Sequence, residues 1–181
     1  MIFESFATLL LAHLVADFPL QSNWVYRLKN TSNFGIALHS LIHVAAAIIL
    51  ARDSVDFWWY WLFLFVTHFI TDWVKLRIKT AQQWIGFMVD QCVHLGVVII
   101  MALMKPNLSS VLPPFALYSL LVLGFVPAIL MFYWIWALDQ GKEKANTSPR
   151  LAWMQQNLLR VSQWSGYPVV VLMVGALLFS N

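Results

Sequence analysis

Long apolar stretches separated by short polar connections run along the whole chain. Six of them have the length of a membrane-spanning helix, which needs about 20 mostly apolar residues. They cover residues 2–26, 34–51, 57–74, 84–104, 115–138 and 164–179. The pattern predicts an all-α, polytopic membrane helix bundle with about six transmembrane helices, forming a single transmembrane domain over residues 1–181.

The one long connection, residues 139–163, has a helical pattern of its own. Ser148 followed by Pro149 is typical of an N-cap and the first turn of a helix. The apolar residues that follow at helical spacing are Leu151, Met154, Leu158 and Val161. We expect a cytoplasmic connection with a short helix on the membrane surface, or alternatively a plain loop. Residues 1–104 would then form a four-helix bundle, and residues 115–181 two scaffold helices.

Composition agrees with a membrane protein. Apolar residues make up 61% of the chain and charged residues only 10%, whereas soluble domains average about 25% charged residues. The single cysteine cannot form an internal disulfide. These values argue against a soluble enzyme, a disordered chain and a secreted disulfide-rich module.

Basic residues are distributed unequally between the connections. Those after the first, third and fifth stretches hold Arg27, Lys29, Lys75, Arg77, Lys79, Lys142, Lys144, Arg150 and Arg160. The others hold Arg52 and Lys105. Positive residues favour the cytoplasmic side, so we expect a multi-pass protein with both termini outside. The net charge of +3 reflects this topology and does not indicate nucleic-acid binding; the oligomeric state is left open.

Ionisable residues inside the apolar stretches are the main functional signal, because they are costly in a membrane. They form four pairs, each separated by four residues and therefore on one helix face. The pairs are His13/Asp17, His39/His43, His68/Asp72 and Asp90/His94. All four fall in the cytoplasmic halves of the predicted helices, so they can meet at one level.

Imidazole and carboxylate groups together are typical metal ligands. We expect these eight residues to hold one or two divalent transition metal ions, with zinc favoured and iron or manganese possible alternatives. Three ionised aspartates give three negative charges, which two divalent ions and one hydroxide would balance.

The two halves of this region are similar in sequence. Residues 9–18 align with residues 64–73, which matches His13 with His68 and Asp17 with Asp72. Residues 36–50 likewise align with residues 87–101. The alignment predicts that the first four helices form a pseudo-two-fold repeat of helical hairpins.

Metal ions make hydroxide available near neutral pH, which favours a hydrolase. The expected substrate is lipid-linked or phosphate-containing and is reached from the cytoplasmic side. Asp72 or Asp90 would act as the catalytic base. Gln21, Gln91, Lys75 and Arg77 would orient ligands or substrate. The alternatives are a metal-ion or proton-coupled transporter, a di-iron membrane oxidoreductase and a metal-stabilised scaffold.

The combined pattern is H-x3-D-x3-Q, H-x3-H, H-x3-D-x2-K and D-Q-x2-H, and it spans about the first hundred residues. It resembles a family of small bacterial integral membrane proteins of unknown function. The resemblance implies a location in the bacterial inner membrane. The scattering of His and Asp over short spans is also similar to that in inner-membrane metal-dependent hydrolases.

Overall fold

The computed structural model describes residues 2–52, 58–78, 80–143 and 148–179, which form seven α-helices and no strand beyond an isolated bridge between Ala51 and Ser110. The helices are α1 (Ile2–Asp17), α2 (Asn23–Thr31), α3 (Asn33–Leu50), α4 (Trp58–Lys75), α5 (Gln83–Met104), α6 (Pro114–Glu143) and α7 (Pro149–Leu178). Helices α3, α5, α6 and α7 are long and apolar enough to cross a membrane. The predicted all-α class with membrane-length helices is therefore confirmed.

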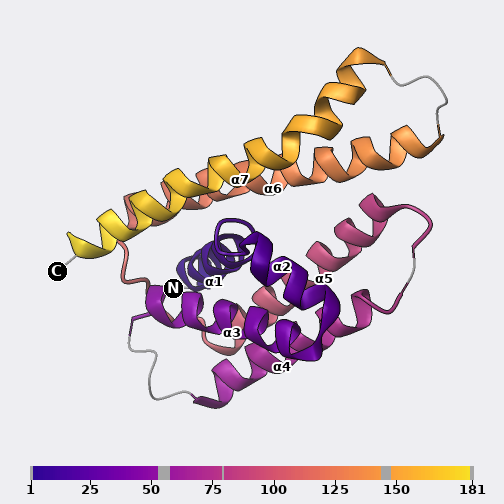
Figure 1. Cartoon of the computed structure of the whole chain (residues 1–181). Coiled ribbons are helices and arrows are strands. Elements are labelled where there is room, and N and C mark those ends of the chain that lie inside the picture. Colours follow the sequence, from indigo (N-terminus) through magenta and orange to yellow (C-terminus); the bar gives the residue numbers. More distant parts are fainter. Residues whose placement is uncertain (1, 53–57, 79, 144–147, 180–181) are drawn as a thin grey trace.

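Four helices form the bundle that carries the polar pairs. Helix α1 packs against α3 and α5, and α4 packs against the same two helices from the opposite side. The α6–α7 hairpin lies beside this bundle and contacts it chiefly through α1 and α5 (Figure 1). Each of the four bundle helices therefore has one face directed toward a shared interior.

The first predicted helix is shorter than expected. It was expected to run over residues 2–26, but α1 ends at Asp17. The cause is Pro19, which lacks an N–H group and disfavours helical geometry at Phe18. Ser22 then begins α2, since its side chain accepts a hydrogen bond of 3.3 Å from the N–H of Val25. Helix α2 is thus a separate element between two bundle helices.

A single serine joins α2 to α3. The N–H of Ser32 donates to the carbonyl of Leu28, and its hydroxyl accepts from the N–H of Gly35 at 3.0 Å. Ser32 is therefore the N-cap, and Asn33 is the first helical residue of α3. A Cβ atom at Gly35 would lie only 2.1 Å from the carbonyl carbon of Leu28. This close approach holds α2 directly against the start of α3.

The C-terminal half also corrects the prediction. The predicted helix start is confirmed, since Ser148 is the N-cap of α7 and Pro149 is its first residue. The rest of the expected connection over residues 139–163 is wrong, because α6 continues to Glu143 and α7 runs on to Leu178 instead of ending as a short surface helix. Side-chain hydrogen bonds explain this continuity. Gln155 donates to the carbonyl of Ala137 at 2.8 Å, and Trp134 donates to the carbonyl of Gln155 at 3.1 Å. The polar residues of this segment thus bind α6 as part of a helical hairpin.

Three positions used in the predictions, Phe57, Lys79 and Lys144, lie outside the described residues. The other predicted helices agree with the structure to within a few residues at each end. In α3, α4 and α5 the predicted polar pairs are among the buried residues of each helix.

Candidate metal centre

The four predicted polar pairs meet inside the bundle. His13 and Asp17 occupy the last turns of α1, and each of α3, α4 and α5 contributes a further pair. Seven of these eight residues are buried, and Asp17 is intermediate, with a side chain 9% exposed. We call the set of His13, Asp17, His39, His43, His68, Asp72, Asp90 and His94 the His/Asp cluster.

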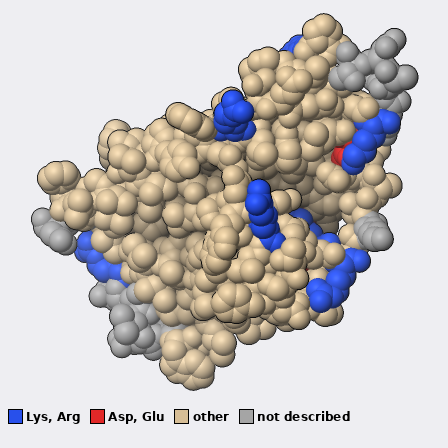
Figure 2. Space-filling view, viewed as in Figure 1, with Lys and Arg blue, Asp and Glu red and all other residues tan. Residues whose placement is uncertain are grey.

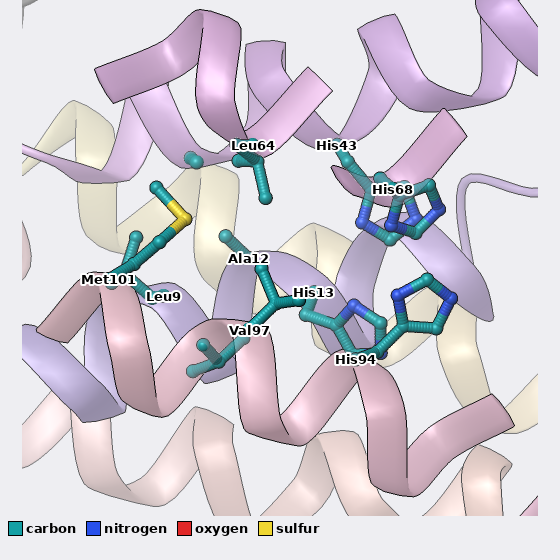
Figure 3. A pocket seen from close by; sticks show the side chains of 11 residues that line it. Leu9, Ala12, His13, His43, Leu64, His68, His94, Val97 and Met101 are labelled. Carbon is teal, nitrogen blue, oxygen red and sulfur yellow. The ribbon is translucent and has the colours of Figure 1, made fainter. Parts of the chain in front are cut away.

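The five imidazole rings of the cluster are in contact with one another. The ring centroids of His43 and His68 are 3.7 Å apart, and those of His68 and His94 are 4.2 Å apart. His13 lies 5.1 Å from both His43 and His94, and His39 lies 4.7 Å from His43. Figure 3 shows four of these rings gathered on one side of a pocket. Rings from all four bundle helices therefore share one space.

Asp17 lies among imidazoles and an amide side chain. Its Oδ1 atom is 3.0 Å from Nε2 of His39 and 3.1 Å from Nε2 of His43. Its Oδ2 atom is 3.3 Å from Nε2 of His13 and accepts a hydrogen bond of 3.1 Å from the side-chain amide of Gln91. One carboxylate thus connects α1 with α3 and α5.

Asp72 has a different environment, because its closest partner is a lysine. Nζ of Lys29, on α2, lies 2.7 Å from its Oδ2 atom. Nε2 of His68 lies 3.4 Å from the same oxygen, and Nε2 of His94 lies 3.9 Å from Oδ1. Lys29 is only 8% exposed. A basic residue expected at the membrane boundary is therefore part of the buried site.

Asp90 also pairs with a lysine. Nζ of Lys75, at the end of α4, lies 2.5 Å from its Oδ2 atom. Its Oδ1 atom lies 3.4 Å from Nε2 of His94. The side chain of Lys75 is 34% exposed, so the polar site reaches the molecular surface beside it.

The four residues expected to orient ligands or substrate divide into two groups. Gln21 lies in the turn after α1, with its side-chain nitrogen 3.1 Å from Nε2 of His39, and Gln91 contacts both Asp17 and Asp90. Lys75 pairs with Asp90, as described above. Arg77 is outside the cluster, where it is exposed, donates to the carbonyl of Trp73 and covers the Trp73 ring. The structure therefore brings Gln21, Gln91 and Lys75 to the site but leaves Arg77 on the surface.

The sequence contained a signal for Lys29 that the helix prediction obscured. Val25 and Lys29 are four residues apart and are the two buried residues of α2. Recognising the break at Pro19 would have separated this amphipathic turn from α1 and placed Lys29 on its inner face.

Three groups of potential metal ligands lie within the cluster, each with ligand atoms no more than 4.8 Å apart. They are Asp17/His39/His43/His68, His13/His68/His94 and Asp72/Asp90/His94. The first and third groups share no residue. The predicted ligands thus form at least two separate sets that could each hold an ion.

Four buried polar atoms of the cluster lack a hydrogen-bond partner among the described residues: His68 Nε2, Asp72 Oδ1, Asp72 Oδ2 and Asp90 Oδ1. Lys29 is close to Asp72 Oδ2, but in an ion pair without hydrogen-bond geometry. Buried polar atoms are nearly always satisfied in proteins. Unsatisfied nitrogen and oxygen atoms facing one space are the donor set that a divalent cation would use, so the residues fit a metal ion.

The pocket beside the cluster is polar at one end and apolar at the other. Its polar end consists of the imidazoles, and its far end includes Leu9, Leu64 and Met101 (Figure 3). Leu9 and Leu64 lie one turn before His13 and His68 on their helices. The bundle is therefore closed by apolar side chains on the side away from Lys29 and Lys75.

One acidic residue outside the cluster is buried for a structural reason. Asp139 of α6 accepts a hydrogen bond of 2.9 Å from the N–H of Trp84, in the first turn of α5, where Gln82 provides no side-chain cap. Lys142 lies 2.9 Å from the other oxygen of Asp139. Sequence reasoning missed this role, because the cap comes from a residue more than fifty positions away.

Fold and site together define the class of the molecule: an all-helical protein with membrane-length helices and a buried cluster of histidines and aspartates. Residues 5–121 match the family described as Protein of unknown function (DUF3307), and the chain belongs to that family. This region contains the whole His/Asp cluster together with Lys29 and Lys75. Comparisons with curated proteins and with solved structures found no match.

Proposed function

We propose that this protein is a metal-dependent integral membrane hydrolase that acts on a lipid-linked or phosphate-containing substrate from the cytoplasmic side. The observation that carries the proposal is the set of unsatisfied buried atoms in the His/Asp cluster, on His68, Asp72 and Asp90. Asp17 forms no ion pair with a lysine or arginine of the described residues, so its charge would be costly in an apolar interior without a metal ion. A tightly bound divalent ion offsets that cost.

The arrangement supports a site built from two similar halves. The sequence alignment that matches Asp17 with Asp72 also matches His43 with His94 and His39 with Asp90. It therefore relates Asp17/His39/His43 to Asp72/Asp90/His94. These are the two non-overlapping ligand sets, except that the first set also contains His68. The packing of α1 and α4 on opposite sides of α3 and α5 agrees with this pseudo-two-fold relation. Two ions, one in each half, are the occupancy we propose.

We propose that six helices cross the membrane: α1 and α4 in addition to α3, α5, α6 and α7. The sixteen residues of α1 span about 24 Å at 1.5 Å per residue, which is most of the hydrocarbon thickness of about 30 Å. His13 and Asp17 of α1 and His68 and Asp72 of α4 lower the hydropathy of the two helices, and all four lie within the His/Asp cluster.

The orientation follows from the basic residues. In Figure 2 most of the visible Lys and Arg side chains lie in the half of the molecule away from the two termini. Arg52 and Lys105 instead adjoin the start of α1, where the N–H of Arg52 donates to the carbonyl of Ser109 and Ser5 donates to the carbonyl of Lys105. We place the end with most of the Lys and Arg side chains in the cytoplasm of a bacterial cell, and both termini outside its inner membrane.

The chemistry we propose is hydrolysis of an ester or anhydride. A divalent ion held by the cluster would supply hydroxide near neutral pH and polarise the oxygen of the substrate. Asp72 Oδ1 and Asp90 Oδ1 accept no hydrogen bond from the described residues, so either oxygen can take a proton from water. The partly exposed Lys75 marks the cytoplasmic entrance, and its ammonium group suits an anionic substrate.

The apolar end of the pocket argues against a transporter. A path through the membrane needs polar groups on both sides of the central site. Leu9, Leu64 and Met101 instead line the outward end of the pocket. A site open only to the cytoplasm suits an enzyme better.

Hydrolysis of lipid phosphates by the full-length protein in detergent tests the proposal. Zinc-loaded wild type should release inorganic phosphate, and a chelator should abolish the release until zinc is restored. His43→Ala should be inactive. Cys92→Ala, on an exposed residue of α5 beside the cluster, should keep full activity. Equal phosphate release from His43→Ala and the wild type would overturn the proposal.

A further inference from the structure

The two ligand sets differ in whether lysines contact their aspartates: Lys29 and Lys75 pair with Asp72 and Asp90, whereas Asp17 contacts imidazoles and an amide. We propose that the two metal positions are unequal: the Asp17/His39/His43 set binds its ion tightly, whereas Lys29 and Lys75 occupy the Asp72/Asp90/His94 set until a second ion displaces them. The inference rests on the proposed metal site and concerns how that site is loaded.

The first set presents no obstacle to a cation. Asp17 contacts three imidazoles and the side-chain amide of Gln91, and no Lys or Arg of the described residues forms an ion pair with it. The Nε2 atoms of His39 and His43 both face Asp17 Oδ1. Neutral imidazoles with one carboxylate form a ligand set that zinc binds tightly.

The second set is already neutralised by the protein itself. Lys29 lies 2.7 Å from Asp72, and Lys75 lies 2.5 Å from Asp90. Two ammonium groups carry the same charge as one divalent cation. A metal ion that binds Asp72 and Asp90 must therefore replace both lysines, because an ammonium group in contact with the same carboxylate repels the ion.

Both lysines can move away from the carboxylates that they pair with. The side chain of Lys75 is already 34% exposed and can turn into water at the end of α4. Lys29 lies on α2, which packs against α3 and contacts α7 through a hydrogen bond of 2.9 Å from Gln163 to Asn23. The close approach at Gly35 holds the end of α2 on α3, so Lys29 leaves Asp72 by a rotation of its own long, flexible side chain. Loading of the second position is thus coupled to movement of the Lys29 side chain away from Asp72.

Displacement also prepares the site for an anion. With both ions present, two lysines and two divalent cations contribute six positive charges against the three of the aspartates. The displaced ammonium groups remain at the cytoplasmic entrance, where phosphate oxygens would bind them. The lysines thus serve as replacement cations in the partly loaded site and as anion-binding groups in the fully loaded site.

Zinc titration of the chelator-stripped, full-length protein in detergent tests the inference. The wild type should bind one ion tightly and a second ion more weakly. In Lys29→Met/Lys75→Met the second ion should bind roughly tenfold or more tightly, since a repulsive charge next to the ion is removed, while the first is unchanged. Lys142→Met, at a lysine 57% exposed and paired with Asp139, is the matched control and should behave as the wild type.

The outcomes separate the two proposals. Equal affinity of the two ions in the wild type, or no change of the second affinity in the double variant, would overturn the inequality and leave the metal site intact. Absence of any tight ion would overturn the proposed metal site itself. Lys75→Met alone, at the more exposed lysine, repeats the test in a variant that keeps the buried Lys29–Asp72 pair.

Discussion

Lys29 and Asp72 form a buried ion pair between α2 and α4, with Nζ of the lysine 2.7 Å from Oδ2 of the aspartate. The lysine belongs to the short helix outside the bundle, and the aspartate belongs to the proposed metal site. The pair therefore connects the position of α2 to the charge of the site.

Replacement of Lys29 by methionine should destabilise the metal-free protein. Removing one partner of a buried ion pair leaves an uncompensated charge and costs about 3–5 kcal/mol in the free energy of unfolding. Thermal unfolding in detergent measures the loss. Zinc should restore more stability to this variant than to the wild type, because Asp72 is then free to bind the ion. Lys142→Met should change stability by at most about 1 kcal/mol, as expected for an exposed pair.

Gln91 should matter for metal affinity more than for stability. Its amide lies 3.1 Å from Asp17 and 3.4 Å from Asp90, so it orients one carboxylate in each ligand set. Gln91→Leu should weaken zinc binding about 10–100-fold, the range typical of residues that position metal ligands. Competition with a zinc-binding dye measures the affinity. Cys92→Ala, at the next position on the helix, should leave it unchanged; equal affinities in the two variants would contradict the role of Gln91.

Gly35 should tolerate no side chain. A Cβ atom there would lie 2.1 Å from the backbone of Leu28, so α2 and the start of α3 would have to separate. Gly35→Ala should lower the free energy of unfolding by about 1–3 kcal/mol. Gly96→Ala is the control, because nothing lies within 4 Å of the added atom. That variant should be unchanged or more stable by about 0.5–1 kcal/mol, and similar unfolding temperatures for both variants would show that the close contact is not required.

Asp139 should act as a helix cap supplied by another helix. Asp139→Ala removes the acceptor for the N–H of Trp84, and loss of such a cap costs about 0.5–2 kcal/mol. Asp139→Asn keeps an acceptor oxygen and should lose less. Thermal unfolding with and without zinc distinguishes this role from a role in the site: the loss should be the same in both conditions, and metal content should not change.

The cluster itself could be predicted from sequence because its signal is local. Each polar pair, such as His68 and Asp72, has the spacing that places both side chains on one helix face, and an apolar membrane helix makes such a pair conspicuous. Matching depths from the membrane boundary then predicted that the pairs meet. None of this required knowledge of how the helices pack.

The parts that escaped prediction depend on turns or on distant partners. Pro19 ends α1 about two turns before the predicted end. Because the prediction continued the helix through Pro19, Lys29 was interpreted as a basic residue at the membrane boundary. The sequence pattern beyond Pro149 predicts a short helix on the membrane surface, whereas Gln155 and Ser162 donate to carbonyls of α6. Asp139 bonds to Trp84, fifty-five residues away. Such contacts are set by tertiary packing, which the periodicity of a single segment does not contain.

The metal content of the full-length protein, purified mildly in detergent and measured by elemental analysis, tests the central claim most directly. We expect the wild type and Cys92→Ala to retain at least one transition metal ion per chain. Asp17→Asn should lose the tight ion, because its carboxylate contacts three of the imidazoles. A wild type with no stoichiometric metal, and none taken up when zinc is supplied, would contradict the account.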